Sequence, residues 1–369
     1  MRTVYALAVS GISALLVCSS ACSGADSTDL SSAPPADTGV PDAAADASGP
    51  TPTTDGGATT PSTAWDSAKL DELAAYAASK STKGLVLVSG EQTILEKYWD
   101  GADASYTQDV FSVQKSVTAT LAAIAIDKGL FTLDDTVTSI LGAGWSNAPA
   151  GQEAKVLVRH LLSMTSGLGL QLGYVAPAGT AWLYNDDAFY RVRLVIEAKT
   201  GKALDAVAHE WLFDRIGMTK STFRARFAKD SKDLPVVGLE TSAHDLVQLG
   251  KMLRARGMWN GASIVPASYV DTLTTSSQTL NPSYGFLFWL NGKSGGLLPP
   301  STPFTGPLIP SAPADAFAAL GKGDQKMYVA RSLDLVMVRI GDSAGESRNA
   351  LSSFDEELWK RVMAAKKTP

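Results

Sequence analysis

Residues 111–129 read FSVQKSVTATLAAIAIDKG, and the predicted fold and site both start from this stretch. Apolar residues recur at a spacing of three or four after Lys115, which predicts a helix over 112–128 with one buried face. A lysine and a glycine at its end are typical of a helix C-terminus. Ser112 and Lys115 lie three residues apart in the first turn, so their side chains lie on the same side of the helix start.

This placement predicts a nucleophilic serine. A serine hydroxyl is a poor nucleophile unless a base lies beside it, and burial beside an apolar helix lets Lys115 lose its proton more easily than in water. The helix start also presents backbone N–H groups, including that of Ser112, to a developing oxyanion. The alternative is a solvated lysine near a capping serine. We expect Ser112 as nucleophile and Lys115 as base.

The composition narrows the class of protein. A chain of 369 residues with 45% hydrophobic residues buries a full core, which predicts one large domain with appendages. The net charge of −5 argues against nucleic acid or an anionic membrane surface as partner. The only cysteines are Cys18 and Cys22, and His209-Glu210 lacks the second histidine of a His-Glu-x-x-His zinc site. We therefore expect neither a metal nor another cofactor.

The first 22 residues are typical of an export signal. A positive charge at Arg2 precedes an apolar run too short to cross a bilayer stably. Residues 19–22, SSAC, favour a lipoprotein signal with lipidated Cys22, although ordinary cleavage near Ala21 is the rival interpretation. We expect an exported protein: a lipoprotein of the bacterial cell envelope that meets the membrane only through Cys22, or else a secreted or periplasmic one.

Residues 23–63 are rich in Ala, Pro, Thr, Asp, Gly and Ser and lack periodic apolar residues. Such a segment cannot bury enough surface to offset its ordering entropy, so it predicts a disordered tether. The folded domain is expected over 64–369.

The pattern within the domain indicates an α+β fold. Strand-like runs lie near both of its ends, at 84–88, 93–96, 284–290, 316–320, 326–330 and 335–340. Helical patterns dominate between them, at 112–128, 156–163, 188–200, 203–216 and 243–256, and a last one covers 353–365. We expect an antiparallel β-sheet flanked by helices, with a mostly helical domain inserted over roughly 112–256.

Two further motifs follow the Ser-x-x-Lys pair in order. Residues 156–168 read VLVRHLLSMTSGL, and residues 177–186 read PAGTAWLYND. Together the three motifs resemble the superfamily of class C β-lactamases, penicillin-binding proteins, D,D-peptidases, esterases and 6-aminohexanoate-oligomer hydrolases. The resemblance implies a β-lactamase/transpeptidase-like fold and an acyl-enzyme mechanism. It also implies that Tyr184 is the third catalytic residue, which relays a proton to the leaving group.

The chain departs from that family at two places. Asp186 stands where the family usually has an asparagine, and a carboxylate accepts but cannot donate a hydrogen bond to a substrate carbonyl. The third family motif, which contains a lysine, is also not plainly present in this chain. One register gives its role to Lys322; the other, which we prefer, places residues 318–320 there, with the Leu320 N–H completing the oxyanion hole. Both departures favour neutral esters or amides over substrates with a carboxylate.

Aromatic residues are expected near the same cleft. Trp182, Tyr284, Phe286 and Trp289 are predicted to line an apolar acyl pocket, with burial in the core as the alternative. The sequence thus predicts a serine hydrolase that is more esterase-like than β-lactam-hydrolysing. A β-lactamase or D-alanyl-D-alanine carboxypeptidase is the first alternative. A catalytically weak cell-wall or ligand-binding module is the second. The oligomeric state stays open.

Overall fold

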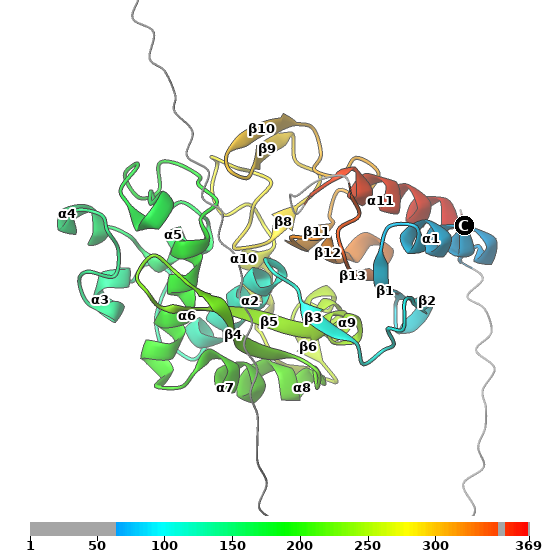
Figure 1. The fold of residues 1–369 in the computed structure, drawn as a ribbon, viewed down its shortest axis with the longest axis horizontal. Helices are drawn as coiled ribbons and strands as arrows, with labels where there is room; N and C mark the ends of the chain where they lie inside the picture. Colours follow the sequence, from blue (N-terminus) through cyan, green and yellow to red (C-terminus); the bar gives the residue numbers. More distant parts are fainter. Residues whose placement is uncertain (1–63, 346–350, 368–369) are drawn as a thin grey trace, which may run out of the picture. The chain divides into compact units, whose positions relative to one another are not determined.

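The central sheet combines strands from both ends of the domain (Figure 1). The computed structural model describes residues 64–345 and 351–367, so the predicted signal, the tether and Cys22 lie outside the described residues. The six strands are antiparallel in the order β2-β1-β13-β12-β11-β8. Their bounds are β1 Thr82–Ser89, β2 Gln92–Tyr98, β8 Trp289–Leu290, β11 Phe317–Gly321, β12 Gln325–Ala330 and β13 Leu335–Gly341.

Alternate side chains of each strand point to opposite faces of the sheet, and helices cover both of these faces. On one face, Tyr328 of β12 contacts Trp359 of α11 (Ser353–Ala365). Helix α1 (Ser67–Ala78) lies side by side with α11 (Figure 1). On the other face, α9 (Ala243–Arg254) comes so close that a Cβ on Gly250 would lie 2.5 Å from Val336. The sheet is therefore buried on both sides.

The predicted helices occur close to the expected positions. The helix that follows Ser112 is α2 (Val113–Asp127), and its side chains are buried as far as Ala125. The others are α5 (Val158–Leu162), α6 (Asp186–Thr200) and a continuous helical stretch over 204–216 made of α7 (Leu204–Ala208), η2 (His209–Phe213) and α8 (Asp214–Ile216). Short helices complete the set: α3 (Val137–Leu141), α4 (Ala150–Glu153), η1 (Leu170–Leu172), α10 (Ala267–Leu273) and η3 (Arg331–Leu333). The expected α+β architecture, an antiparallel sheet with flanking helices, is confirmed.

The region over 112–256 is less helical than predicted. Strands β4 (Thr222–Lys229) and β5 (Pro235–Ser242) form a hairpin there, and β3 (Thr107–Asp109) pairs with β5 to complete a second sheet. The predicted strand over 284–290 was also wrong in extent, because only β8 at its end is a strand. Two small hairpins, β6 (Met258–Trp259) with β7 (Ala262–Ser263) and β9 (Gly295–Leu298) with β10 (Thr302–Thr305), were not predicted. None of the described helices has the length and apolar character needed to span a membrane.

Candidate active site

Strand β3 of the second sheet leads directly to Ser112. Strand β3 is prolonged by a hydrogen bond from the Val110 N–H to the Leu239 carbonyl, 3.0 Å. Phe111 then takes a left-handed conformation with φ of 49°, which is uncommon for a bulky residue. The Asp109 carboxylate supports this turn, since it accepts from the Phe111 N–H at 2.8 Å and pairs with Arg226. This sharp turn places Ser112 immediately before the first residue of α2.

Ser112 and Lys115 meet as predicted. The Lys115 Nζ lies 2.9 Å from the Ser112 Oγ. The Ser112 hydroxyl does not cap the helix, so it is not occupied by the backbone of α2. Among the described residues, the Ser112 N–H also donates no hydrogen bond. Neither the hydroxyl nor the N–H of Ser112 is therefore used by the helix that follows it.

Lys115 is buried and forms an ion pair with Asp186, 2.6 Å from Nζ to Oδ1. Burial is the largest single influence and disfavours its charge, but the neighbouring oxygens of Tyr184 and Asp186 together outweigh it. The pKa of Lys115 is therefore raised above its ordinary value. In return the Lys115 charge lowers the pKa of Asp186. Burial thus acts on Lys115 in the expected direction, but the acid that the chain supplies beside the lysine keeps it charged in this state.

Tyr184 lies over the same ammonium group, with its ring centre 5.1 Å from the Lys115 Nζ. Its ring stacks on Trp289 at 6.3 Å and meets Tyr284 edge to face at 6.4 Å. Trp182, Tyr284 and Trp289 are all buried. These aromatic residues hold Tyr184 in place, and Trp289 does not form the open pocket wall that was predicted for it.

Asn185 has a role that the sequence reasoning missed. Its side-chain oxygen accepts from the Ala188 N–H at 3.1 Å and thereby caps α6, while its amide donates to the carbonyls of Leu168 and Gly169 at 2.8 and 2.7 Å. It therefore ties the Tyr184 segment to the loop after the 156–168 motif. An asparagine directly before a helix is a capping signal, so the cap itself was predictable.

The end of β11 lies against the turn before Ser112. A Cβ on Gly321 would come 2.3 Å from the Val110 carbonyl, so the two backbones are in direct contact. The Asn291 N–H donates to the Ala316 carbonyl, and backbone groups alternate along a strand. By that alternation the Leu320 N–H points to the β8 side. Strand β8 starts at Trp289, opposite Ala318, so it offers Leu320 no partner. The Leu320 N–H therefore points to the same edge of β11 as β8 but lies beyond the residues that β8 pairs with.

Lys322 lies in the turn between β11 and β12 and is exposed. Its Nζ is 5.9 Å from the centre of the Phe111 ring. This agrees with the preferred register, in which Leu320 lies on the strand and Lys322 follows it. Lys322 lines a different cavity from the one that contains Tyr184 and Asp186.

A cavity of about 400 Å³ opens beside the Tyr184 segment. Its walls come from the 168–171 loop, residues 183–187, and Pro300 and Ser301 after β9. Two carboxylates, Asp186 and Asp187, line it, and among the described residues no Lys or Arg side chain does. The cavity is therefore a poor environment for a negatively charged group. Across 64–345 and 351–367, no group of three or more His, Cys, Asp or Glu residues could hold a metal ion.

Comparison with known proteins agrees with this architecture. The chain is 24% identical over 298 residues to an uncharacterised protein of Alkalihalophilus pseudofirmus, covering 72% of this chain and 85% of that protein. The fold is similar to that of a candidate β-lactamase from Bacteroides dorei, with a TM-score of 0.66 and 18% identity over 82% of this chain and 99% of the other. It is also similar to EstCE1, a hydrolase with promiscuous acyltransferase activity, with a TM-score of 0.60 and 16% identity over 80% and 97% of the two chains.

The family model for β-lactamase matches residues 71–351, which is most of the described domain. The matched region contains the turn at Ser112, the Tyr184 segment and strand β11. On this match and on the fold, the chain belongs to the β-lactamase family.

Proposed function

We propose that this protein is a serine hydrolase that cleaves small neutral esters or amides through an acyl-enzyme intermediate. The observation that carries the proposal is the 2.9 Å contact between the Ser112 Oγ and the Lys115 Nζ at the start of α2. Among the described residues, the Ser112 N–H donates no hydrogen bond and β8 offers the Leu320 N–H no partner, which supports the proposal. These two N–H groups suit the oxyanion of a tetrahedral intermediate.

In the proposed reaction the Ser112 Oγ forms a bond to the substrate carbonyl carbon and gives its proton to the neutral form of Lys115. The bond to the leaving oxygen or nitrogen then breaks, and Tyr184 relays a proton to that atom. A water molecule next attacks the acyl carbon, the bond to the Ser112 Oγ breaks, and the carboxylic acid leaves. The Ser112 hydroxyl regains its proton, so the cycle closes without a cofactor.

The charges around the site favour uncharged substrates. A substrate carboxylate beside Asp186 and Asp187 meets like charge, and Lys115 is already paired with Asp186. Lys322, the other cation considered for an anchor, lies in the exposed turn. β-Lactams and D-alanyl-D-alanine peptides, which carry a carboxylate, are therefore the less suitable class.

The direct test is covalent labelling. Incubation with a fluorophosphonate is expected to add one adduct to the wild type, located on Ser112 by peptide mass spectrometry. Ser112→Ala is expected to take no label and to lose at least about a thousandfold in kcat/KM for p-nitrophenyl butyrate, since the nucleophile is removed. The melting temperature of the variant serves as the control for folding. A folded wild type that takes no label and turns over no ester is instead a binding module.

We also propose that the protein is exported and lipidated on Cys22, which rests on the sequence of the first 22 residues alone. In a bacterium with lipoprotein processing, the wild type is expected to enter the detergent phase of a Triton X-114 partition, and Cys22→Ala to stay in the aqueous phase. A wild type that is already aqueous indicates ordinary secretion.

A further inference from the structure

The two segments that carry the proposed oxyanion donors touch at Gly321 and Val110, and a cavity opens beside this contact. This second cavity of about 400 Å³ lies between the segment before Ser112 and the turn after β11. Its walls include Gln108 and Phe111 on one side, and Lys322, Gly323 and Gln325 on the other. Because packing is interrupted beside the Gly321–Val110 contact, the placement of the two segments also depends on the groups that span the cavity.

The side chain of Gln325 bridges this gap. Its Oε1 accepts from the Gln108 Nε2 at 2.6 Å and from the Gly341 N–H at 3.2 Å. Its Nε2 donates to the carbonyls of Gly341 and Gly323 at 2.6 and 3.0 Å. Gln325 is 1% exposed, and these bonds use both donors and both acceptor positions of the amide. One side chain thus joins β3, the β11–β12 turn and the end of β13.

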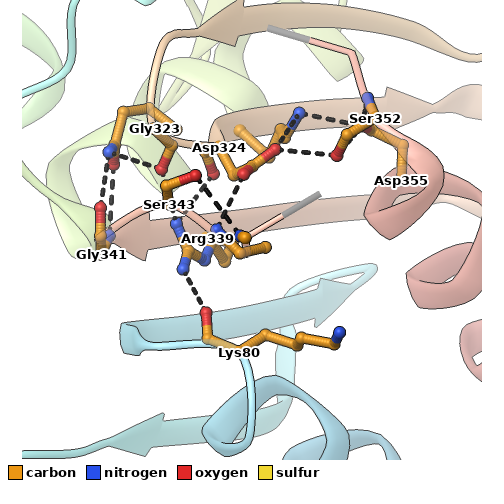
Figure 2. A network of polar contacts seen from close by, with 12 residues as sticks. Lys80, Gly323, Asp324, Arg339, Gly341, Ser343, Ser352 and Asp355 are labelled. Atoms are coloured by element: carbon orange, nitrogen blue, oxygen red, sulfur yellow. Dashed lines mark hydrogen bonds and ion pairs between the residues drawn. The ribbon is translucent and has the colours of Figure 1, made fainter. Parts of the chain in front are cut away.

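The turn that Gln325 holds is also bound by hydrogen bonds on its other side. Gly323 and Asp324 both have positive φ, 73° and 61°. The Arg339 guanidinium donates to both of their carbonyls, at 3.0 and 3.1 Å, and to the Lys80 carbonyl at 2.8 Å (Figure 2). The buried Asp324 carboxylate accepts from the Ala344 N–H and the Ser352 hydroxyl. The turn is therefore a fixed point against which the segment before Ser112 is placed.

We infer that Gln325 is a positioning residue that sets the distance between the Ser112 and Leu320 N–H groups. On one side, Gln108 lies four residues before Ser112, and the Asp109 carboxylate holds the Phe111 N–H between them. On the other, Gln325 pairs with Gly321 in the hairpin, next to Leu320. This inference rests on the proposed acyl-transfer function and adds a residue to it.

Gln325→Met keeps the size of the side chain and removes all four hydrogen bonds. We expect kcat for p-nitrophenyl butyrate to fall by about 10- to 100-fold, because a small displacement of an oxyanion donor is costly. KM is expected to change by less than about threefold, since the donors act mainly in the transition state. Asn291→Leu is the matched control: it is a buried amide that donates to the carbonyls of Ile309, Ala312 and Pro313.

A thionoester, in which sulfur replaces the carbonyl oxygen, gives a readout specific to the oxyanion hole. The preference for the ester over its thionoester is expected to fall by about tenfold in Gln325→Met and to stay unchanged in Asn291→Leu, because sulfur accepts hydrogen bonds poorly. Gln108→Met removes the Gln108–Gln325 hydrogen bond by changing its half-buried partner. This variant is also expected to lower kcat and the preference for the ester. The double variant is expected to lose little more than Gln325→Met alone.

Unchanged kcat and unchanged ester preference in folded Gln325→Met overturn the inference. If that variant does not fold, the same result in Gln108→Met overturns it. Failure of the proposed function has a different signature: wild-type turnover that survives Ser112→Ala, or no turnover by the wild type at all, and either result overturns both.

Discussion

Two buried lysines of this chain both meet carboxylates, but their surroundings differ. The Lys115 side chain is 4% exposed and pairs with Asp186, whose side chain is 57% exposed. The Lys326 side chain is 0% exposed and pairs with Asp324 and Asp355, which are 0% and 1% exposed. In the first pair the acid reaches solvent and the cation touches the Ser112 hydroxyl, whereas in the second every charge is enclosed.

The difference separates the proposed reactive site from a structural ion-pair network. The Lys326 network joins β12 to the start of α11, where Asp355 also accepts from the Tyr328 hydroxyl and the Ser352 N–H (Figure 2 shows Ser352, Asp355 and Asp324). Enclosed charges are strongly destabilising when one partner is removed. A half-exposed acid can be solvated again, so the Lys115 pair can be altered without unfolding the protein.

The largest expected effects concern the two lysines and differ in kind. The Lys115 variant is expected to lose activity, and the Lys326 variant is expected to lose stability. Lys115→Met is expected to lower kcat by about a thousandfold and to change the denaturation midpoint little, because Asp186 remains in water. Lys326→Met is expected to lower the free energy of unfolding by about 3–5 kcal/mol, because it leaves two buried carboxylates without their cation. Ester turnover and urea denaturation of both variants measure this contrast.

A thousandfold loss of activity in folded Lys326→Met, or a large loss of stability in Lys115→Met, contradicts the assignment of Lys115 to activity and Lys326 to stability. Lys326→Arg serves as the control that keeps the charge. Asp355→Asn tests the same network from the acid side and is expected to destabilise without changing KM.

The next effect concerns substrate charge. We expect kcat/KM for p-nitrophenyl butyrate to exceed that for nitrocefin by at least about a hundredfold, since a partly desolvated like-charge contact costs a kcal/mol or more. Lys322→Ala is expected to change the ester value by less than about threefold, because Lys322 lies in the exposed turn. Rapid nitrocefin hydrolysis that Lys322→Ala abolishes makes Lys322 the carboxylate anchor and removes the proposed preference.

The smallest effect is a shift in pH dependence. The base must be neutral, and the pKa of Lys115 is raised, so kcat/KM is expected to rise with pH through the neutral range. Asp186→Asn removes an interaction that raises this pKa while burial, which lowers it, remains. The rise is then expected to move to lower pH, with about a tenfold gain at pH 7. Identical pH profiles for the wild type and Asp186→Asn exclude Asp186 as the group that keeps Lys115 charged.

The sequence by itself determined the features that depend on neighbours along the chain. The helix after Ser112 and the contact between Ser112 and Lys115 both depend on residues within one helical turn. Local spacing decides such features, because residues three apart share one side of a helix. The order of motifs was likewise enough to predict the β-lactamase-like fold.

The tertiary structure alone decided the contacts between distant residues. Gln108 and Gln325 are 217 positions apart, and nothing near either one indicates that their amides meet. The β4–β5 hairpin pairs with β3 from across the α2 segment, so its partner was not readable from its own pattern. Trp289 has the same aromatic character in a pocket wall as in the core, and only its packing on Tyr184 distinguishes the two. In each case the topology brings together groups whose local sequence is compatible with several partners.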